Sequence, residues 1–364
     1  MRPSVVLMLA SALFASLAGG VFIFNQDKKI IIENTTITGA LTPGVEQTKL
    51  ALIEQALKKS NNVKGIYIGA SKINNYFKDL LNETELNGLV IDVKEAYGPN
   101  LPFSLKSSIS EFHKKDIWMI ARIAVFRDSS LMVDKPEWYL AATTSMPWRD
   151  QAKQYWLDPK NEEVQNYLIE FSKKIIDYGF DELQFDYIRY PDDYKYVSGQ
   201  EKIKVIGDFF SKLSQALRSY KPSIILSADL FGYVATQFNS YGTGQRLIDA
   251  AKYFDYISFM LYPSHFYGGF SAPEDLKRQI PGVYFPYKDD NTTSTGHLVS
   301  NNPYDVVLRS IFSSIDYSES YGLKIKIRPW LQDFDLKIDI ARGISYDAEK
   351  VRLEISAAEA AGSF

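Results

Sequence analysis

The sequence predicts an α/β protein built as a (β/α)8 barrel of the TIM type, for three reasons. From residue 64 onward, short β-branched runs alternate with longer amphipathic stretches, a pattern typical of a parallel sheet with helical crossovers. The repeating units are nearly equivalent, which favours a barrel over the alternative, a doubly wound sheet. The length of 364 residues also suits one large α/β domain better than two small ones.

The composition excludes several classes of protein. Hydrophobic residues make up 46% of the chain, which rules out disorder, and the net charge of −3 argues against a nucleic-acid binder that neutralises phosphates. The absence of cysteine excludes disulfide frameworks, zinc ribbons and thiol catalysis. Only His113, His265 and His297 are present, too few and too scattered for the metal site of a deacetylase or phosphoesterase. We therefore predict no metal and no cofactor.

The first element is an apolar segment, Val5 to Phe24, which Arg2 precedes. About 20 such residues span a bilayer as a helix, so residues 1–24 are expected to be an uncleaved signal-anchor or, alternatively, a cleaved signal peptide. Either interpretation puts the remaining chain outside the cytoplasmic membrane, on a single N-terminal pass or secreted. Residues 25–61 are predicted to form a linker with one helix, over Gln47–Lys59, and residues 62–364 the barrel.

The elements of the barrel follow in order. The β-branched runs predict seven strands, at Gly65–Ile68, Gly88–Val93, Ile117–Val125, Glu182–Ile188, Ile224–Leu230, Tyr256–Leu261 and Leu323–Ile327. The clearest helical stretches between them are Asn161–Tyr178, Glu201–Tyr220, Gly244–Tyr253 and Tyr304–Tyr321.

No eighth strand is apparent. The sequence ends in Ala358-Glu-Ala-Ala-Gly-Ser-Phe364, which is typical of a helix end with its glycine stop. A barrel that lacks one strand exposes the edges of its first and seventh strands. We therefore expect this sequence to be truncated before the last strand.

Strand parity predicts a polar inner face. Side chains alternate between the two faces of a strand, so the fourth strand carries Glu182, Gln184 and Asp186 on one face. Its other face carries Leu183 and Phe185, which should pack against the helices. The polar set therefore points into the barrel.

The same parity places charged residues near the carboxyl ends of several strands, where barrel enzymes build their active sites. A charged group inside a barrel is costly unless it is paired or used. We predict that one site contains Asp92, Lys94, Arg122, Asp186, Asp229 and Arg328. The alternative is a buried ion-pair network that only stabilises the barrel.

Two carboxylates at one mouth predict glycosidic chemistry, in which one protonates the leaving oxygen and the other acts as nucleophile or as base for a water. Asp186 and Asp229 lie on adjacent strands, so a separation of about 5 to 9.5 Å is reasonable. We assign Asp186 as nucleophile or general base and Asp229 as general acid. Arg189 either holds Asp186 ionised or forms a loop salt bridge.

The remaining candidates are assigned to substrate binding. His265 follows the sixth strand and either contacts substrate hydroxyls or is structural. Trp330 follows the seventh strand and is the best platform for stacking on a sugar face, and Glu95 is the first spare acid. The whole binding set comprises Asp92, Lys94, Glu95, Arg122, Gln184, Arg189, Tyr262, His265, Arg328 and Trp330.

Eight ordered segments make the chain resemble a bacterial family of glycoside-hydrolase-like domains, long classed as a domain of unknown function within the TIM-barrel glycosidases. The strongest segment is Gly179-Phe-Asp-Glu-Leu-Gln-Phe-Asp-Tyr-Ile-Arg-Tyr-Pro191. The others begin at Val90, Ile120, Pro136, Trp156, Ser227, Met260 and Arg328. The resemblance implies a (β/α)8 barrel that acts on a polysaccharide or glycan in an envelope or secreted protein. It also puts Asp186 at the nucleophile or base position and leaves the role of Asp229 open.

Two features depart from that family, which continues beyond the last helix into a Trp-containing strand. This strand is absent here, and residues 281–302 form a longer, Tyr- and Asn-rich insertion expected to reshape one rim of the cleft. Asn291 begins a short glycosylation-like motif. We predict a membrane-anchored glycoside hydrolase acting on an envelope or extracellular polysaccharide, with no nucleic-acid partner. The alternative is a non-catalytic glycan-binding or scaffold barrel on the cell surface.

Overall fold

The computed structural model describes residues 22–25, 28–31, 43–143, 146–240, 242–288 and 295–363. The chain divides into two compact units, Met1–Gln47 and Thr48–Phe364. Asn291 and its glycosylation-like motif lie outside the described residues.

The first unit contains an antiparallel hairpin of β1 (Phe22–Asn25) and β2 (Lys28–Ile31). The predicted apolar helix therefore differs from the structure over residues 22–24, which form a strand, while residues 1–21 lie outside the described residues. Within the described ranges, no helix combines the length and the apolar character needed to cross a membrane. Helix α1 (Pro43–Lys59) continues into the second unit.

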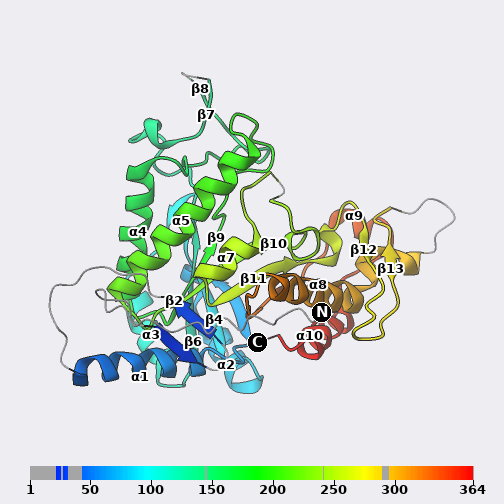
Figure 1. Ribbon diagram of the computed structural model, residues 1–364, viewed down its shortest axis with the longest axis horizontal. Coiled ribbons are helices and arrows are strands. Elements are labelled where there is room, and N and C mark those ends of the chain that lie inside the picture. The colour runs from blue at the N-terminus through cyan, green and yellow to red at the C-terminus, as the bar shows by residue number, and fades with distance from the viewer. Residues whose placement is uncertain are drawn as a thin grey trace, which may run out of the picture. The chain divides into compact units, whose positions relative to one another are not determined.

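The second unit is built on a curled, mostly parallel sheet (Figure 1). Its strand order is β14-β11-β10-β9-β6-β4-β3, and every neighbouring pair along this path is parallel. The strands are β3 (Gly65–Gly69), β4 (Gly88–Glu95), β6 (Trp118–Ala124), β9 (Glu182–Asp186), β10 (Ile225–Phe231), β11 (Tyr256–Leu261) and β14 (Trp330–Leu331). The short β5 (Gly98–Pro99) pairs antiparallel with β4. The predicted α/β class with a mostly parallel sheet is confirmed.

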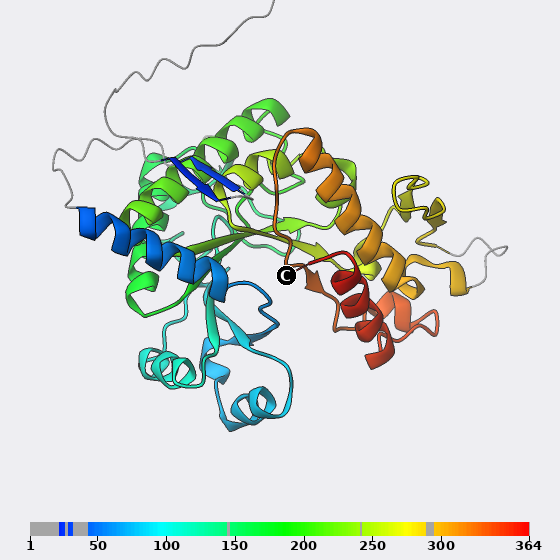
Figure 2. The same cartoon turned by 60° about the horizontal axis from the view of Figure 1, so that its bottom comes forward.

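Helices connect successive strands and lie around the outside of the sheet (Figure 2). They are α2 (Asn75–Glu83), α3 (Leu105–His113), α4 (Glu162–Asp177), α5 (Gly199–Tyr220), α6 (Val234–Gln237), α7 (Leu247–Tyr253), α8 (Pro303–Ser320), α9 (Lys337–Ile340) and α10 (Ala348–Ala360). Two of the longest begin at capping side chains: Asn161 accepts from the first turn of α4, and Ser198 from that of α5. Two small hairpins project from loops: β7 (Ala141–Thr143) with β8 (Met146–Pro147), and β12 (Phe270–Ala272) with β13 (Val283–Phe285).

The alternation predicted for the fourth strand is present in β9. Leu183 and Phe185 belong to the large core between sheet and helices, whereas Glu182, Gln184 and Asp186 are buried without joining it. A second apolar cluster fills the inside of the curled sheet, formed by Val63, Val90, Trp118, Ile120, Ile225 and Tyr256, with Ala56 and Leu57 of α1 packed against it. The inner face therefore carries this apolar cluster near the strand starts, beside the buried carboxylate of Glu182, and is polar farther along.

The sheet curls so far that its two edge strands approach each other. No ladder joins β3 to β14 in the described part of the chain, so the sheet is not the closed ring expected of a complete barrel. The rings of Tyr67 on β3 and Trp330 on β14 nevertheless lie 6.3 Å apart, edge to face. Near the strand starts, Arg328 Nη2 donates to the Ser60 carbonyl over 2.9 Å, and Lys326 Nζ to the Asn61 side chain over 2.7 Å. Side chains therefore bridge the two edges.

The seventh strand differs from its predicted position, Leu323–Ile327. In the structure only Ile327 forms a bridge, to Ile257, and the ladder resumes as β14 at Trp330–Leu331. Pro329 separates the two points of pairing, and proline has no N–H to give to a ladder. The strand is therefore interrupted and shifted toward the carboxyl end.

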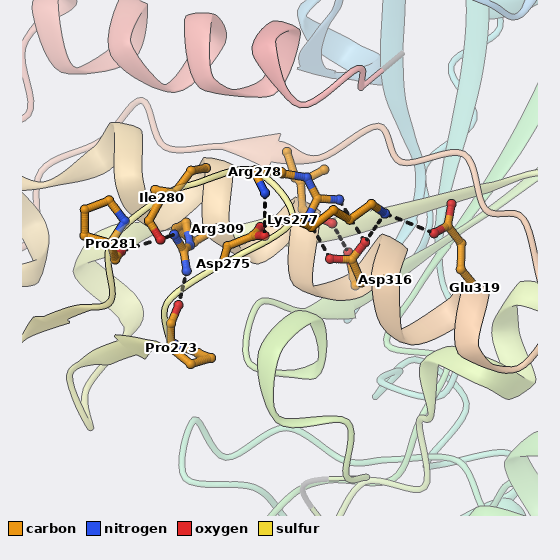
Figure 3. A network of polar contacts seen from close by, with 11 residues as sticks. Pro273, Asp275, Lys277, Arg278, Ile280, Pro281, Arg309, Asp316 and Glu319 are labelled. Atoms are coloured by element: carbon orange, nitrogen blue, oxygen red, sulfur yellow. Dashed lines mark hydrogen bonds and ion pairs between the residues drawn. The ribbon is translucent and has the colours of Figure 1, made fainter.

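A loop after β12, residues 273–281, is tied to α8 by charged side chains (Figure 3); we call it the strap. Arg309 of α8 is buried and donates to the carbonyls of Pro273, Ile280 and Pro281. Arg278 of the strap makes a two-pronged pair with Asp316 at 2.7 and 2.8 Å. The strap thus depends on a helix for most of its polar contacts.

Candidate active site

Arg122, in the middle of β6, faces three carboxylates that come from three other strands. Its Nη1 lies 2.5 Å from Asp92 Oδ1, its Nη2 pairs with Asp186 Oδ2, and its Nε lies 3.9 Å from Asp229 Oδ2. Asp92 belongs to β4, Asp186 ends β9 and Asp229 lies in β10. The structure thus brings together four of the six charged residues expected to converge.

Strand register explains this meeting. Arg122 pairs in the ladder with Asp92 on one side and with Gln184 on the other, two residues before Asp186. All three carboxylates are nearly inaccessible: the exposed fraction of the side chain is 0% for Asp92, 8% for Asp186 and 1% for Asp229, against 16% for Arg122. The cluster therefore reaches solvent mainly through Arg122 and Asp186.

The surroundings shift the pKa of both Arg122 and Asp229. Burial disfavours the charge on Arg122, but Asp186, Asp92 and Asp229 outweigh this effect and raise its pKa. Burial, and next the charge of Asp186, raise the pKa of Asp229 well above its usual range, although Arg122 opposes this. The protonated form of the Asp229 carboxyl is therefore favoured.

Asp186 is held by the backbone that follows it. The Tyr187 N–H donates to Asp186 Oδ1 over 2.6 Å, and Tyr187 has a φ of 49°. This left-handed conformation is uncommon for a bulky residue, and such conformations cluster at functional sites. The turn ends β9 and fixes the carboxylate against Arg122.

The two edge strands supply one donor each to the cluster. The Tyr67 hydroxyl donates to Asp92 Oδ2, and the Trp330 indole N–H donates to Asp229 Oδ1 over 2.9 Å. Trp330, expected as a stacking platform, thus uses its polar edge on a carboxylate. Tyr67 was not among the predicted residues, although parity in Gly65–Ile68 puts it on the same face as Gly65, opposite Ile66 and Ile68.

Arg328 does not join the cluster, contrary to expectation. Its Nη1 lies 3.0 and 2.9 Å from the two carboxylate oxygens of Glu182, the first residue of β9. Trp118 and Ser227 also donate to Glu182, and the Arg328 guanidinium covers the Tyr256 ring at 3.9 Å. Because Ile327 pairs with Ile257 near the start of β11, Arg328 lies at the level of the strand starts.

Lys94 is also absent from the cluster. The register shifts between Asp92 and Lys94, which breaks the alternation on which the prediction relied. The Lys94 ammonium is fully buried, 2.8 Å from Asp128 Oδ2 and 2.6 Å from the Ala124 carbonyl. It therefore forms an internal ion pair away from the predicted site.

Gln184 lies on β9 between Asp186 of the carboxylate cluster and Glu182, the partner of Arg328. Its Nε2 donates to Ser258 Oγ over 3.1 Å, and its buried Oε1 has no hydrogen-bond partner within the described ranges. Glu95, the last residue of β4, is exposed, and its pKa is raised by partial burial and by the neighbouring Asp92. Glu95 is therefore the acid nearest in sequence to the cluster that solvent reaches.

Arg189 is surrounded by rings rather than paired with an acid. Its guanidinium lies 4.2 Å from the Phe231 ring centre and 5.1 Å from that of Trp156, and Nη1 donates to the Tyr190 carbonyl. Burial lowers its pKa, although Asp186 opposes this. Neither expected ion pair is present in the described part of the chain.

Tyr262 and His265 follow β11 on the same side as the cluster. Burial, then Asp229 and Asp186, raise the pKa of Tyr262, so its hydroxyl remains protonated. Burial lowers the pKa of His265, which favours the neutral ring. The two rings lie 5.3 Å apart.

A glycine lets the cluster's strands approach closely. Gly232 directly follows β10, and a Cβ atom at this position would lie 2.4 Å from the Met260 carbonyl oxygen of β11. Any larger residue would push the end of β10 away from β11. Gly232 therefore helps to set the position of Asp229, three residues earlier.

The model of a family described as "Putative glycosyl hydrolase domain" matches residues 64–363. No curated protein matches the sequence. A hypothetical protein from Ruminiclostridium thermocellum is 32% identical over 45% of this chain and 96% of its own, with a TM-score of 0.39.

Two structures of an α-galactosidase from Thermus thermophilus share the fold. The complex with stachyose is 15% identical and has a TM-score of 0.51, and that with p-nitrophenyl α-D-galactopyranoside is 16% identical with a TM-score of 0.50. Each alignment covers 86% of this chain, which spans only 64% and 60% of the respective α-galactosidase chains.

Proposed function

The chain belongs to this family of glycosyl hydrolase domains, and from that premise we propose that it hydrolyses glycosidic bonds with Asp186 and Asp229 as the two acting carboxylates. One observation carries the proposal: both carboxylates face the same guanidinium, Arg122, from adjacent parallel strands. Paired carboxylates beside the scissile bond are what glycoside hydrolysis requires.

The environments of the two acids support different roles. A general acid must be protonated before the reaction, and the raised pKa of Asp229 favours the protonated form. Asp186 accepts hydrogen bonds from Arg122 and from the Tyr187 N–H, which stabilise a negative charge. Asp229 then gives its proton to the leaving oxygen, while Asp186 attacks the anomeric carbon or removes a proton from the attacking water.

The proposed substrate is an envelope or extracellular polysaccharide. The apolar run that begins at Val5 supports delivery of the domain outside the cytoplasmic membrane, as a signal-anchor or as a cleaved signal. Cell fractionation and N-terminal sequencing of the expressed protein test this part: a soluble cytoplasmic protein that retains residue 1 would contradict it.

The experiment is a hydrolysis panel of p-nitrophenyl glycosides, stachyose, pullulan and chitin oligosaccharides. We expect Asp186→Asn to lose activity about equally on every cleaved substrate, by on the order of 1,000-fold or more. Asp229→Asn should lose much less on p-nitrophenyl glycosides, because nitrophenolate leaves without a proton. Asp79→Asn, which changes an exposed carboxylate on helix α2, serves as the matched control.

Two outcomes would overturn the assignment. Equal activity of the wild type and Asp186→Asn would remove Asp186 from the chemistry. Glycan binding without any release of reducing ends would favour the non-catalytic glycan-binding barrel instead.

A further inference from the structure

A row of aromatic rings leads away from the carboxylate cluster. Five residues form this aromatic row: Tyr262, His265, Tyr267, Tyr287 and Phe334. It begins at Tyr262, directly after β11, whose last residues pair with Trp330 and Leu331 of β14. Asp229 and Asp186 both act electrostatically on the Tyr262 hydroxyl. The Trp330 indole N–H donates to Asp229 Oδ1, so the row begins beside the strand ends that carry the proposed catalytic site.

The rings succeed one another at contact distance. Tyr262 lies 5.2 Å from Phe334 and 5.3 Å from His265, and His265 lies 5.7 Å from Tyr267, nearly parallel to it at 27°. Tyr267 in turn lies 5.3 Å from Tyr287. The five rings therefore form one continuous series of contacts from Tyr262 to Tyr287.

Exposure increases from the start of the row to Tyr267, and Tyr287 beyond it is half-buried. Tyr262 and His265 are half-buried, whereas Phe334 is 37% and Tyr267 57% exposed. Large aromatic side chains exposed together are unusual on a protein surface unless they bind something. Since Tyr and His combine a flat apolar body with a polar tip, the row suits a ligand with both apolar faces and hydroxyl groups.

Hydrogen bonds of Gln332 and Arg342 fix the loops that carry the aromatic row. The buried Gln332 accepts from the Ser264 N–H over 3.1 Å and donates to Ser264 Oγ and to the Phe334 carbonyl. Arg342 donates to the Tyr287 carbonyl over 2.9 Å. The loops that carry the rings are thus fixed to each other, which lowers the entropy lost when a ligand binds.

We propose that the aromatic row binds successive sugar rings of a polymeric glycan, one bond of which lies at Asp186 and Asp229. This inference rests on the proposed function for the position of the cleaved bond and for the polymeric substrate, and it adds the surface that binds the polymer beyond that bond. The glycan chain lies along the β11 and β14 side of the sheet, over Tyr262 and then over Phe334 and Tyr267.

The test measures polymer binding in an Asp186→Asn background, where hydrolysis does not interfere. Affinity gel electrophoresis with pullulan, galactomannan, xylan or soluble peptidoglycan fragments gives a dissociation constant for each variant. Tyr267→Ala and Phe334→Ala should each weaken binding of the retained polymer by about 2- to 10-fold, and the double variant by more. Tyr267→Trp, which keeps a flat ring, should retain most of the affinity.

Tyr284→Ala is the matched control. Tyr284 lies on β13 outside the row and is 66% exposed, close to the value for Tyr267. Its substitution should leave polymer binding unchanged. Tyr267→Ala should keep the thermal unfolding transition of the Asp186→Asn parent because the Tyr267 ring is exposed, and the transition of each other variant is measured alongside its binding.

The outcomes separate this inference from the proposed function. Ring-dependent polymer binding without hydrolysis by the wild type would support the aromatic row and overturn the proposed hydrolase. Hydrolysis of p-nitrophenyl glycosides together with unchanged polymer affinity in Tyr267→Ala and Phe334→Ala would support the proposed hydrolase and overturn the aromatic row as a glycan site. Failure of all four polymers to retard the Asp186→Asn protein would also overturn the aromatic row as a glycan site.

Discussion

The Trp330 indole N–H donates to Asp229 Oδ1 over 2.9 Å, so the last strand of the sheet contacts the carboxyl group proposed as the general acid. A hydrogen bond to the charged form of an acid stabilises that form and lowers its pKa. Trp330 accordingly opposes part of the upward shift that burial and Asp186 impose on the pKa of Asp229.

Trp330→Phe should therefore move the alkaline limb of the activity profile. Loss of the indole N–H raises the pKa of Asp229 further, so the protonated acid persists to higher pH and activity declines later. The measurement is kcat/KM against pH from 4 to 10 on a cleaved substrate. Trp138→Phe, which removes an indole bond to the surface Glu163, is the control, and an alkaline limb that stays in place or moves to lower pH would contradict the role of Asp229.

Substitutions of Lys94 and Asp128, which form a buried ion pair, should have strongly non-additive effects on the free energy of unfolding. Lys94→Met leaves Asp128 buried without its cation, 0% exposed and bonded on its other oxygen only to Ser130. We expect a loss of about 3–5 kcal/mol in the free energy of unfolding, and recovery of most of it in the double variant Lys94→Met with Asp128→Asn. Urea denaturation of the single and double variants measures this, and additive losses would refute the pairing.

Glu354 should make the protein less stable as the pH rises. This fully buried residue of α10 accepts from the Gln332 N–H and from the Tyr346 hydroxyl. Burial nevertheless raises its pKa from 4.5 to about 8. The pKa of Glu354 is thus higher in the folded protein than in the unfolded chain. Its contribution to the free energy of unfolding is therefore fully present below pH 4.5 and is lost as the pH rises toward 8.

Glu354→Gln removes this ionisation. The free energy of unfolding of the wild type, relative to the variant, should fall by on the order of 4 kcal/mol between pH 5 and pH 9. Urea denaturation of both proteins at the two pH values gives the difference. If the two proteins respond to pH in parallel, Glu354 is ionised in the folded protein and the expectation is wrong.

The strap should loosen when Arg309 is replaced. Arg309→Met leaves the carbonyls of Pro273, Ile280 and Pro281 without their shared donor, and Arg309→Lys keeps the charge without the planar fork. Hydrogen exchange should accelerate across the strap in both variants, with the peptides of β9 unchanged. Lys277→Ala, whose ion pairs with Asp316 and Glu319 are exposed, should have little effect.

Strand parity predicted much of the candidate site because it needs only the period of two along a strand. It correctly turned Asp92, Arg122, Asp186 and Asp229 to the inner face, where they meet. It failed at Lys94, where an irregularity in the ladder breaks the period. Such an irregularity has no signature in the alternation of apolar and polar residues.

The other differences arise from register, which a single strand does not encode. Arg328 has the expected inward parity, but Ile327 pairs near the start of β11, and the arginine meets Glu182 instead of the cluster. Arg189 lies in a loop, where its contacts with Phe231 and Trp156 depend on the ends of distant strands. The roles proposed for Asp186 and Asp229 remain predictions for the hydrolysis panel.

The meeting of Tyr67 with Trp330 across the two sheet edges makes the proposed activity depend on the two edges coming together. Each ring also serves one acid, Asp92 or Asp229. A molecule in which β3 and β14 have separated would lose both hydrogen-bond donors together, even with its helices intact. Copies whose two sheet edges have separated should consequently lack the proposed hydrolase activity.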